Sequence, residues 1–295
     1  MLRISREGRD ALKFLLPYFA FLGFFIIYPM ISSFYYSLNN VHLSDLKFAF
    51  IGLGNYVRIL SDKVFAQALT QTLIYVSLHT VIGVPLGLGI ALLLNQEFRG
   101  RSVARVCLLI PWATPPIVCA MMFSIFLHPY YGTINYTMQW LGLVPQEFRI
   151  FSNPQIALFG LVIVSMWKSA PLFAFIFLSG LQALPTEILE SAKVYGASSF
   201  AVFRKIILPY LKPTLAVNCI LSGFLALAGT QAFDLVIGIT RGGPGYNTYM
   251  LYFLSYTIAF PWNLLGYGAT IAWVVTIISV IFALVLLKLW YKRIY

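Results

Sequence analysis

Charged residues are scarce in this sequence, and four long stretches have none. Only 10% of the 295 residues are Asp, Glu, Lys or Arg, and 60% are hydrophobic, whereas soluble domains carry about 25% charged residues. The four longest uncharged stretches cover 14–44, 64–96, 106–146 and 242–287. Each is longer than the roughly 20 apolar residues that a helix needs to cross a bilayer. This pattern excludes a soluble globular protein and predicts an integral membrane protein.

The distribution of positive charge predicts the topology. We expect about six transmembrane helices, near 14–38, 70–94, 107–128, 155–180, 213–238 and 267–288. Of the 20 Lys and Arg residues, 14 lie at the termini or in the connections after the second and fourth spans, 5 lie in the other connections, and Lys168 lies inside a span. Because cytoplasmic loops are enriched in Lys and Arg, both termini are expected in the cytoplasm. The net charge of +11 therefore reflects topology and does not indicate nucleic-acid binding.

The remaining segments complete an all-α polytopic organisation. We expect a cytoplasmic N-terminus over 1–13, a first transmembrane helix over 14–38, an extracytoplasmic loop over 39–69 and a transmembrane core over 70–295. The segment 248–260 is apolar but too short to span, which predicts a helix at the outer interface. Within the core, 181–212 is a polar cytoplasmic connection between the fourth and fifth spans.

This connection has the signals of two short helices. Thr186 is placed to cap the first, with Glu187 near its positive end, and Gly196 is placed to end it in a left-handed conformation. Ser198 or Ser199 is placed to cap the second, and Pro209 to stop it. Their apolar faces must pack against the chain's own spans or against another protein, and both alternatives are open at this point.

The sequence contains no motif typical of a catalytic site. The sequence has no G-x-x-x-x-G-K-[ST] motif, so it is not expected to hydrolyse ATP. The histidines are scattered without a second ligand at helical spacing, which argues against a metal site: His42, His79 and His128. All three cysteines lie in apolar runs and are expected to be buried free thiols: Cys107, Cys119 and Cys219. We expect no enzyme activity, no catalytic residue and no metal or cofactor in this chain.

Two ionisable residues, Lys168 and Asp234, lie well inside apolar segments. A charge at mid-bilayer costs at least ~2.5–3.5 kcal/mol, so it is expected to face a partner or a wet cavity. One interpretation is structural, with Asp234 reaching the outer interface and Lys168 bonded to carbonyls freed by Pro171. The other places both residues along a solute pathway, and the sequence leaves the two open.

The 181–212 connection resembles the EAA loop of the permease subunits of ABC importers. The matching residues are Glu190-Ser191-Ala192-x-x-x-Gly196, followed after nine residues by Ile206-x-Leu208-Pro209. Two positions depart from the usual pattern: Ser191 replaces an Ala, and Tyr195 stands where Asp commonly precedes the Gly.

Further motifs along the chain resemble the carbohydrate branch of these permeases, which handles maltose, trehalose, glycerol-phosphate and related solutes. They are Gly52-Leu53-x-Asn55-Tyr56, Arg105 with Leu109 to Trp112, Leu181-Gln182-x-Leu184-Pro185, and Phe233-Asp234 with Thr240-x-Gly242-Gly243-Pro244. The resemblance implies a permease core over 70–295 in a prokaryotic cell membrane, importing a di- or oligosaccharide by ATP-driven alternating access.

The same resemblance implies partners and site residues. The partners would be a homologous second permease, two ATP-binding cassette subunits that bind ATP-Mg, an extracytoplasmic sugar-binding protein and membrane lipid, with no nucleic acid. The ATPase-coupling residues would be Glu187, Glu190, Ser191, Ala192 and Gly196. The substrate-binding residues would be Lys168, Ser169, Leu172, Thr230, Gln231 and Asp234. Two alternatives stay open: an ABC permease for glycerol-phosphate or another anion, with Lys168 as counter-charge, and an ion-coupled secondary transporter.

Overall fold

The chain is largely helical in the residues that the computed structural model describes, which are 6–146, 148–227 and 229–294. Side chains are described there except at 6–12, 230 and 289–294. Four helical segments are long and apolar enough to cross a membrane: Lys13–Ser37, Lys63–Asn95, Ala157–Gln182 and Leu265–Lys288. Two bent helix pairs bring the number to six if each pair is one span. The prediction of a helical polytopic membrane protein is therefore confirmed, while the number of spans and the side of the termini stay predictions.

The chain folds as two compact units, and the smaller consists of Met1–Asp62 with Ser255–Val274. Its first long helix is formed by α1 (Arg6–Leu22), a π-helical stretch η1 (Gly23–Ile27) and α2 (Tyr28–Ser37). A short antiparallel hairpin follows, made of β1 (Asn39–Val41) and β2 (Phe48–Phe50), and then α3 (Gly54–Ser61). This hairpin differs from the all-α expectation. It was not predicted because strands of three residues are too short to show an alternating hydrophobic pattern.

The motif at Gly52–Tyr56 closes the end of the first helix. The Asn55 amide, which is buried, donates to the carbonyl oxygens of Ser37 and Asn39, both at 3.0 Å. The hydroxyls of Tyr56 and Ser37 lie 2.9 Å apart. Helix ends leave carbonyl oxygens without intrahelical partners, so this motif has a structural role.

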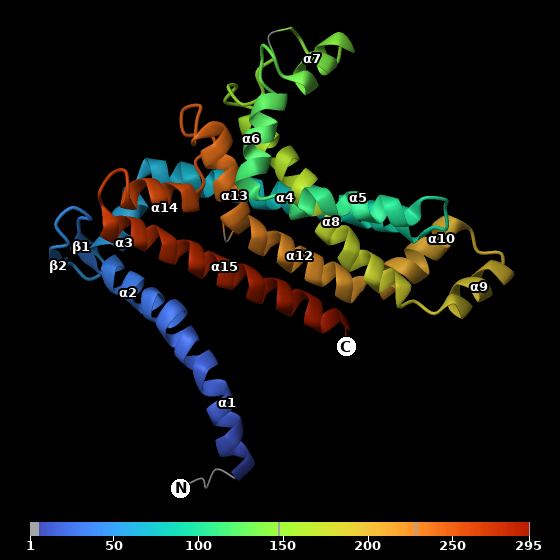
Figure 1. Ribbon diagram of the computed structural model, residues 1–295, viewed down its shortest axis with the longest axis horizontal. Coiled ribbons are helices and arrows are strands. Elements are labelled where there is room, and N and C mark those ends of the chain that lie inside the picture. Colours follow the sequence, from blue (N-terminus) through green and yellow to red (C-terminus); the bar gives the residue numbers. More distant parts are fainter. Residues whose placement is uncertain (1–5, 147, 228, 295) are drawn as a thin grey trace. The chain divides into compact units, whose positions relative to one another are not determined.

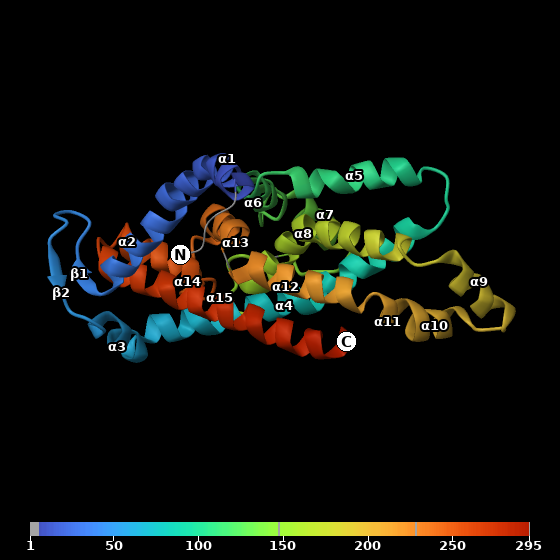
Figure 2. The ribbon, with the colours of Figure 1, turned by 90° about the horizontal axis from the view of Figure 1, so that it is seen from below.

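The larger unit, Lys63–Leu254 with Val275–Tyr295, is built around two long helices, α4 (Lys63–Asn95) and α8 (Ala157–Gln182). They pack along each other more extensively than any other described pair (Figure 2). A side chain at Gly83 would collide with Met166, and one at Gly87 would collide with Phe173. The GxxxG motif therefore permits the close approach of two helices, as expected for a membrane interior.

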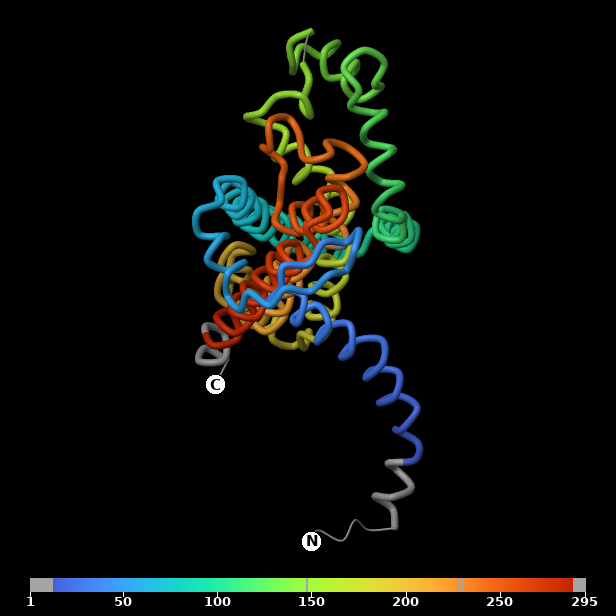
Figure 3. Tube along the Cα trace, turned by 90° about the vertical axis from the view of Figure 1, so that its left-hand side faces the viewer, coloured from blue at the N-terminus to red at the C-terminus, as the bar shows by residue number. Residues whose placement is uncertain are grey.

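The predicted third span, 107–128, is not one straight helix. α5 (Arg101–Ala113) and α6 (Pro116–Phe126) meet at 96°, and Figure 3 looks down α5 while α6 runs away from it. The consecutive prolines Pro115 and Pro116 explain the break, because neither has an N–H to donate to the preceding turn.

The predicted fifth span, 213–238, is also interrupted. α12 (Lys212–Leu227) is followed by Gly229 in the left-handed conformation, with φ of +78°, and then by α13 (Thr230–Leu235) and the π-helical stretch η3 (Val236–Thr240). A side chain at Gly229 would also collide with the Tyr252 ring. Backbone conformation and lack of space therefore both favour glycine at this break.

The outer segments and the last helix complete the fold. α7 (Thr133–Trp140) lies in the connection between the third and fourth predicted spans, α14 (Leu251–Ala259) occupies the predicted interfacial segment, and α15 (Leu265–Ile294) is the last helix. Cys119 is buried, but Cys107 is exposed on α5, so the expectation that all three thiols are buried is wrong.

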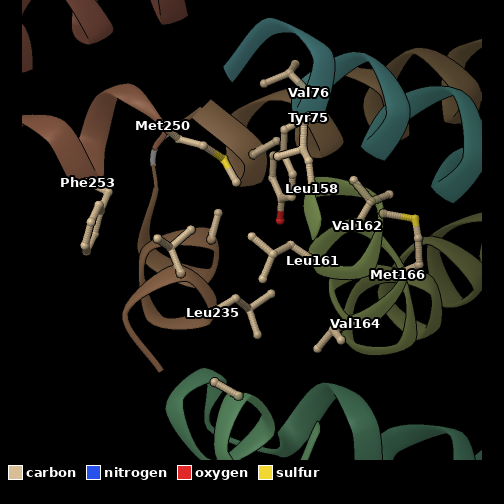
Figure 4. Close-up of a cluster of buried hydrophobic side chains, with 14 of the residues drawn as sticks. Tyr75, Val76, Leu158, Leu161, Val162, Val164, Met166, Leu235, Met250 and Phe253 are labelled. Carbon is tan, nitrogen blue, oxygen red and sulfur yellow. The ribbon is translucent and has the colours of Figure 1, made fainter. Parts of the chain in front are cut away.

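A buried hydrophobic cluster fixes how α4, α8 and α13 meet. Figure 4 shows the Tyr75 hydroxyl of α4 pointing towards Leu161 of α8, with Leu235 of α13 on the far side of Leu161. Each of these three residues is at most 1% exposed. The apolar packing holds in place the polar residues that follow on the same helices.

Candidate functional site

The Lys168 ammonium is bonded to the break between α5 and α6. Its Nζ donates to the carbonyl oxygens of Trp112, at 2.9 Å, and Thr114, at 2.6 Å. The helical partners of the Trp112 carbonyl would be the N–H groups of residues 115 and 116, which are prolines. Lys168 therefore bonds the Trp112 carbonyl that these prolines leave free, together with the Thr114 carbonyl at the helix break, and the expected pairing with carbonyls freed by Pro171 is wrong.

Ser169 and Gln231, predicted in the same site from distant parts of the sequence, are brought together. The Gln231 amide nitrogen donates to Ser169 Oγ at 3.0 Å and to Ser165 Oγ at 3.0 Å. All three residues are buried. The contact joins α8 to α13 directly after the break at Gly229.

Two further helices join this network through His79. Its Nε2 lies 3.2 Å from Ser169 Oγ, and its Nδ1 lies 2.8 Å from Ser222 Oγ on α12. Thr80 Oγ1 lies 3.1 Å from the same Ser222 hydroxyl. A hydrogen-bonded chain thus runs through α4, α8, α12 and α13 inside the larger unit. Because unpaired polar groups are costly in apolar surroundings, each of these side chains is used structurally.

The other predicted solute residues lie near this network. Leu172 is half-buried on α8, one turn beyond Lys168. Asp234 is half-buried on α13, three residues from Gln231 and hence on a neighbouring part of the same helix face. Thr230 begins α13, but its side chain lies outside the described residues. The described part of this predicted site is a mostly buried polar strip in which Ser169 and Gln231 bond to each other.

Three residues of this network were not predicted from the sequence: His79, Ser165 and Ser222. Ser165 and Ser169 are four residues apart, which places both hydroxyls on one face of a helix. His79 is a polar residue in an uncharged apolar run, and intramembrane polar residues commonly hydrogen-bond across helices. The sequence therefore indicated that these residues make hydrogen bonds, but it did not identify their partners. Among the described residues, no group of three His, Cys, Asp or Glu side chains is placed to hold a metal ion.

The 181–212 connection forms the two predicted helices. They are α9 (Thr186–Val194) and a second helix made of α10 (Ser199–Val202), the π-helical stretch η2 (Phe203–Ile207) and α11 (Leu208–Tyr210). Figure 1 shows α9 and α10 beyond the ends of α8 and α12. Ser198 Oγ caps the second helix by accepting from the Ala201 N–H.

Two details of this connection differ from expectation. Residue 185, a proline, is the N-cap of α9, and no side-chain cap bond forms, so the capping role of Thr186 is wrong. Pro209 does not stop the second helix, which continues to Tyr210 and then bends by 67° into α12. The π-helical stretch before Pro209 includes a bond from the Leu208 N–H to the Phe203 carbonyl, a local adjustment that accommodates a proline within a helix.

Gly196 ends α9 as predicted. It has φ of +73°, its N–H donates to the Lys193 carbonyl, and the Ala197 N–H donates to the Ala192 carbonyl. These two bonds define a Schellman cap. The cap turns the chain sharply between the two helices.

The surface of this turn is uncovered. No residue of α9 is buried, and the side chains of Val194, Tyr195 and Phe200 are 86%, 87% and 69% exposed. The residues expected to couple to an ATPase are at most half-buried: Glu187, Glu190, Ser191, Ala192 and Gly196. Within this chain the apolar face of α9 is therefore not packed against the spans, which disfavours that alternative.

These features define a helical membrane protein with a buried polar strip and an exposed pair of short loop helices. The chain belongs to the family of binding-protein-dependent transport system inner membrane components, which matches residues 83–294. It is accordingly a membrane-embedded permease, and the ion-coupled secondary transporter is set aside.

Individual relatives cover nearly the whole chain. It is 35% identical to the trehalose/maltose transport system permease protein MalF of Thermococcus litoralis, over 96% of this chain and 94% of that protein. It is 34% identical to the sulfoquinovosyl glycerol transport system permease protein SmoG of Agrobacterium fabrum, over 95% and 89%. A chain of a bacterial ABC transporter involved in the import of the acidic polysaccharide alginate superposes with a TM-score of 0.82, over 96% of both chains, at 20% identity. That last similarity is one of fold.

Proposed function

We propose that this chain carries a di- or oligosaccharide inward as one of two permeases in an ATP-driven importer. Two ATPase subunits and an extracytoplasmic sugar-binding protein complete the assembly. The observation that carries the proposal is the uncovered loop of α9 and α10, held in a fixed turn by the Gly196 cap. Relatives named for transport of trehalose/maltose and of sulfoquinovosyl glycerol support the class of solute.

The loop is suited to receive force from another protein. Tyr195 and Val194 offer apolar surface at the turn, and Glu187 and Glu190 offer negative charge along α9. The second helix is followed within one residue by α12, which leads to the break at Gly229 and to Gln231. Movement of the loop by a closing ATPase would therefore be transmitted to the solute site, in an alternating-access cycle.

The solute site in this proposal comprises Lys168, Ser169, Leu172, Thr230, Gln231 and Asp234. The hydroxyl and amide groups of Ser169 and Gln231 match the donors and acceptors of a sugar. A bound sugar would have to exchange hydrogen bonds with those that the two side chains make to each other.

An anionic saccharide is the second candidate, because Lys168 is a buried cation in this region. An ammonium has three N–H donors, and two of these are used by the carbonyls of Trp112 and Thr114. Most of its bonding capacity is therefore committed within the chain, which favours a neutral sugar.

The test is uptake by the complete complex in proteoliposomes. The permease pair, the ATPases and the binding protein are reconstituted, and uptake of labelled trehalose, maltose and a uronate-containing trisaccharide is measured with and without ATP. We expect uptake of a neutral sugar that requires both ATP and the binding protein. Uptake of the uronate trisaccharide alone would favour the anion alternative, and an assembled complex that hydrolyses ATP but takes up none of these sugars would overturn the proposal.

A further inference from the structure

We infer that the outer hollow, a pocket lined by residues of 124–130 and 149–152 and by Ile239, is a second saccharide subsite. It would hold one sugar unit on the side of the chain that the predicted topology places outside the cell. The inference rests on the proposed function, which supplies the class of ligand. None of its lining residues is among the six predicted solute residues on α8 and α13.

The outer hollow is large enough for a sugar unit. Its volume is about 320 Å³, within the range of roughly 300–1,000 Å³ that small-molecule sites have. A second hollow of about 590 Å³ shares Arg149 and Ser152 with it. The two together offer room for more than one unit of an oligosaccharide.

The walls of the outer hollow are fixed by the fold of the connection that contains α7. The Asn135 side chain, which is 1% exposed, donates to the carbonyl oxygens of Pro129 at 3.1 Å and Phe148 at 3.3 Å. It therefore ties the two lining segments together. A Cβ at Gly132 would lie 2.5 Å from the backbone nitrogen of His128, so the turn between them is tight. A site formed in advance loses less conformational freedom on binding.

Arg149 and Tyr130 provide hydrogen-bonding groups at the rim. Arg149 Nη2 donates to the Tyr130 hydroxyl at 2.6 Å, and the guanidinium carbon lies 5.2 Å from the centre of the same ring. A guanidinium has five N–H donors, and this bond uses one of them. The Tyr130 hydroxyl accepts that bond and keeps its own proton for donation. Both groups are therefore equipped to bind sugar hydroxyls.

His128 adds a further donor among the lining residues. The backbone N–H of Tyr130 donates to His128 Nδ1 at 3.3 Å, so Nδ1 is an acceptor and the proton of the neutral ring is on Nε2. The ring is stacked on Tyr131 at 3.6 Å between centroids. Its orientation is thus fixed by two contacts of neighbouring residues.

The deeper side of the outer hollow is apolar. Leu127, which is 8% exposed, belongs to the buried hydrophobic cluster, and Phe151 and Ile239 pack against that cluster. By contrast, Tyr130 is 77% exposed and Arg149 is also exposed. A sugar ring has C–H groups on its faces and hydroxyls around its edge. A pocket with apolar depth and a polar rim matches this distribution.

One helical stretch connects the outer hollow with the predicted solute residues. Ile239 and Gln231 both lie on the apolar helix Gln231–Thr240, and their separation of eight residues corresponds to about 12 Å at 1.5 Å per residue. A Cβ at Gly238 would lie 2.6 Å from the Ala120 side chain, so this helix packs closely on α6. A sugar released from the outer hollow would reach Gln231 by moving along this helix.

The test is photolabelling of the complete importer in proteoliposomes, with diazirine derivatives of maltose and trehalose as probes and mass spectrometry to locate the label. We expect label within 124–155 that excess unmodified sugar displaces. Arg149→Gln should reduce this label about three- to tenfold, as for the loss of one hydrogen bond. Arg58→Gln is the matched control, because Arg58 also lies over a tyrosine ring, that of Tyr267 at 4.3 Å, and should leave the label unchanged.

A second variant guards against a local change of fold in Arg149→Gln. Ser152 is exposed and lines both hollows, so Ser152→Trp should obstruct them while the bond between Arg149 and Tyr130 remains. Label that persists in both variants would overturn the inference. Label from a uronate-containing trisaccharide derivative alone would also overturn it, because the hollow would then be an anion site.

Two further outcomes separate this inference from its neighbours. If Arg149→Gln weakens docking of the binding protein while the sugar label is unchanged, the hollow is a protein contact and the inference fails. If the wild-type importer takes up maltose or trehalose without label in 124–155, the subsite alone fails. If it takes up neither sugar, the proposed function fails and the inference falls with it.

Discussion

The Nζ atom of Lys168 lies 2.6 Å from the carbonyl oxygen of Thr114, at the point where α5 turns into α6. The two residues are 54 positions apart in sequence, and their contact ties the long helix α8 to the 96° bend between α5 and α6. A buried cation that would be costly alone is thereby paired with carbonyls that would otherwise lack donors. The lysine thus has a structural role whatever it contributes to solute binding.

Replacement of Lys168 should therefore destabilise the chain before it alters selectivity. Lys168→Met keeps the length of the side chain but leaves the carbonyls of Trp112 and Thr114 without this donor, at about 1–3 kcal/mol for each buried group. We expect a lower thermal unfolding temperature in detergent and a parallel decrease in uptake of neutral and anionic sugars. Lys168→Arg, which keeps the charge, should retain part of both. A stable Lys168→Met protein that loses only anionic uptake would instead assign the residue to solute binding.

The close contact of α4 and α8 gives a second prediction. Gly87→Ala would place a methyl group against Phe173 and the backbone of residue 174, and overpacking of this kind typically costs about 1–3 kcal/mol. Gly89→Ala is the matched control, because a Cβ there meets nothing within 4 Å. We expect a lower unfolding temperature for Gly87→Ala and an unchanged or higher one for Gly89→Ala. Similar behaviour of the two variants would contradict this packing.

Gly196 provides a prediction for coupling. A Cβ at this position meets nothing within 4 Å, so a substitution acts through the left-handed backbone, which costs roughly 1–2 kcal/mol for an ordinary residue. Gly196→Val should weaken the Schellman cap and reduce co-purification of the ATPase. Gly196→Asn, which tolerates this conformation better, should retain more ATPase although its side chain is of similar size. Both variants should still insert into the membrane.

Equal loss of ATPase in the two Gly196 variants would show that the lack of a side chain matters more than the backbone conformation. Normal assembly and transport in both Gly196 variants would contradict a role of this loop in coupling to the ATPase.

Local signals in the sequence predicted much of this structure. Long uncharged runs located the apolar helices. The cap at Gly196 was also predicted, because a left-handed turn depends on residues adjacent in the chain. The breaks were harder to predict, since hydrophobicity continues through Pro115 and Gly229 while the helix does not.

The hydrogen bonds of the buried network could not be predicted from one sequence. Ser169 and Gln231 were placed in one site by family resemblance, and their direct contact is seen only in the fold. Ser222 and His79 are 143 residues apart, and nothing local indicates that they share a hydrogen bond. A polar residue in an apolar helix indicates that it has a hydrogen-bond partner, but tertiary packing determines which residue that partner is.

The central claim is that the loop of α9 and α10 binds an ATPase, and cross-linking tests it most directly. The native cysteines are first replaced: Cys107, Cys119 and Cys219. A single cysteine is then introduced at Val194, which is 86% exposed, or at Val57, which is 65% exposed on α3. In intact membranes containing the complete importer, we predict that a short thiol-to-amine reagent joins Val194→Cys, and not Val57→Cys, to the ATPase subunit. Failure of Val194→Cys to reach the ATPase, in a complex that still transports, would contradict the account.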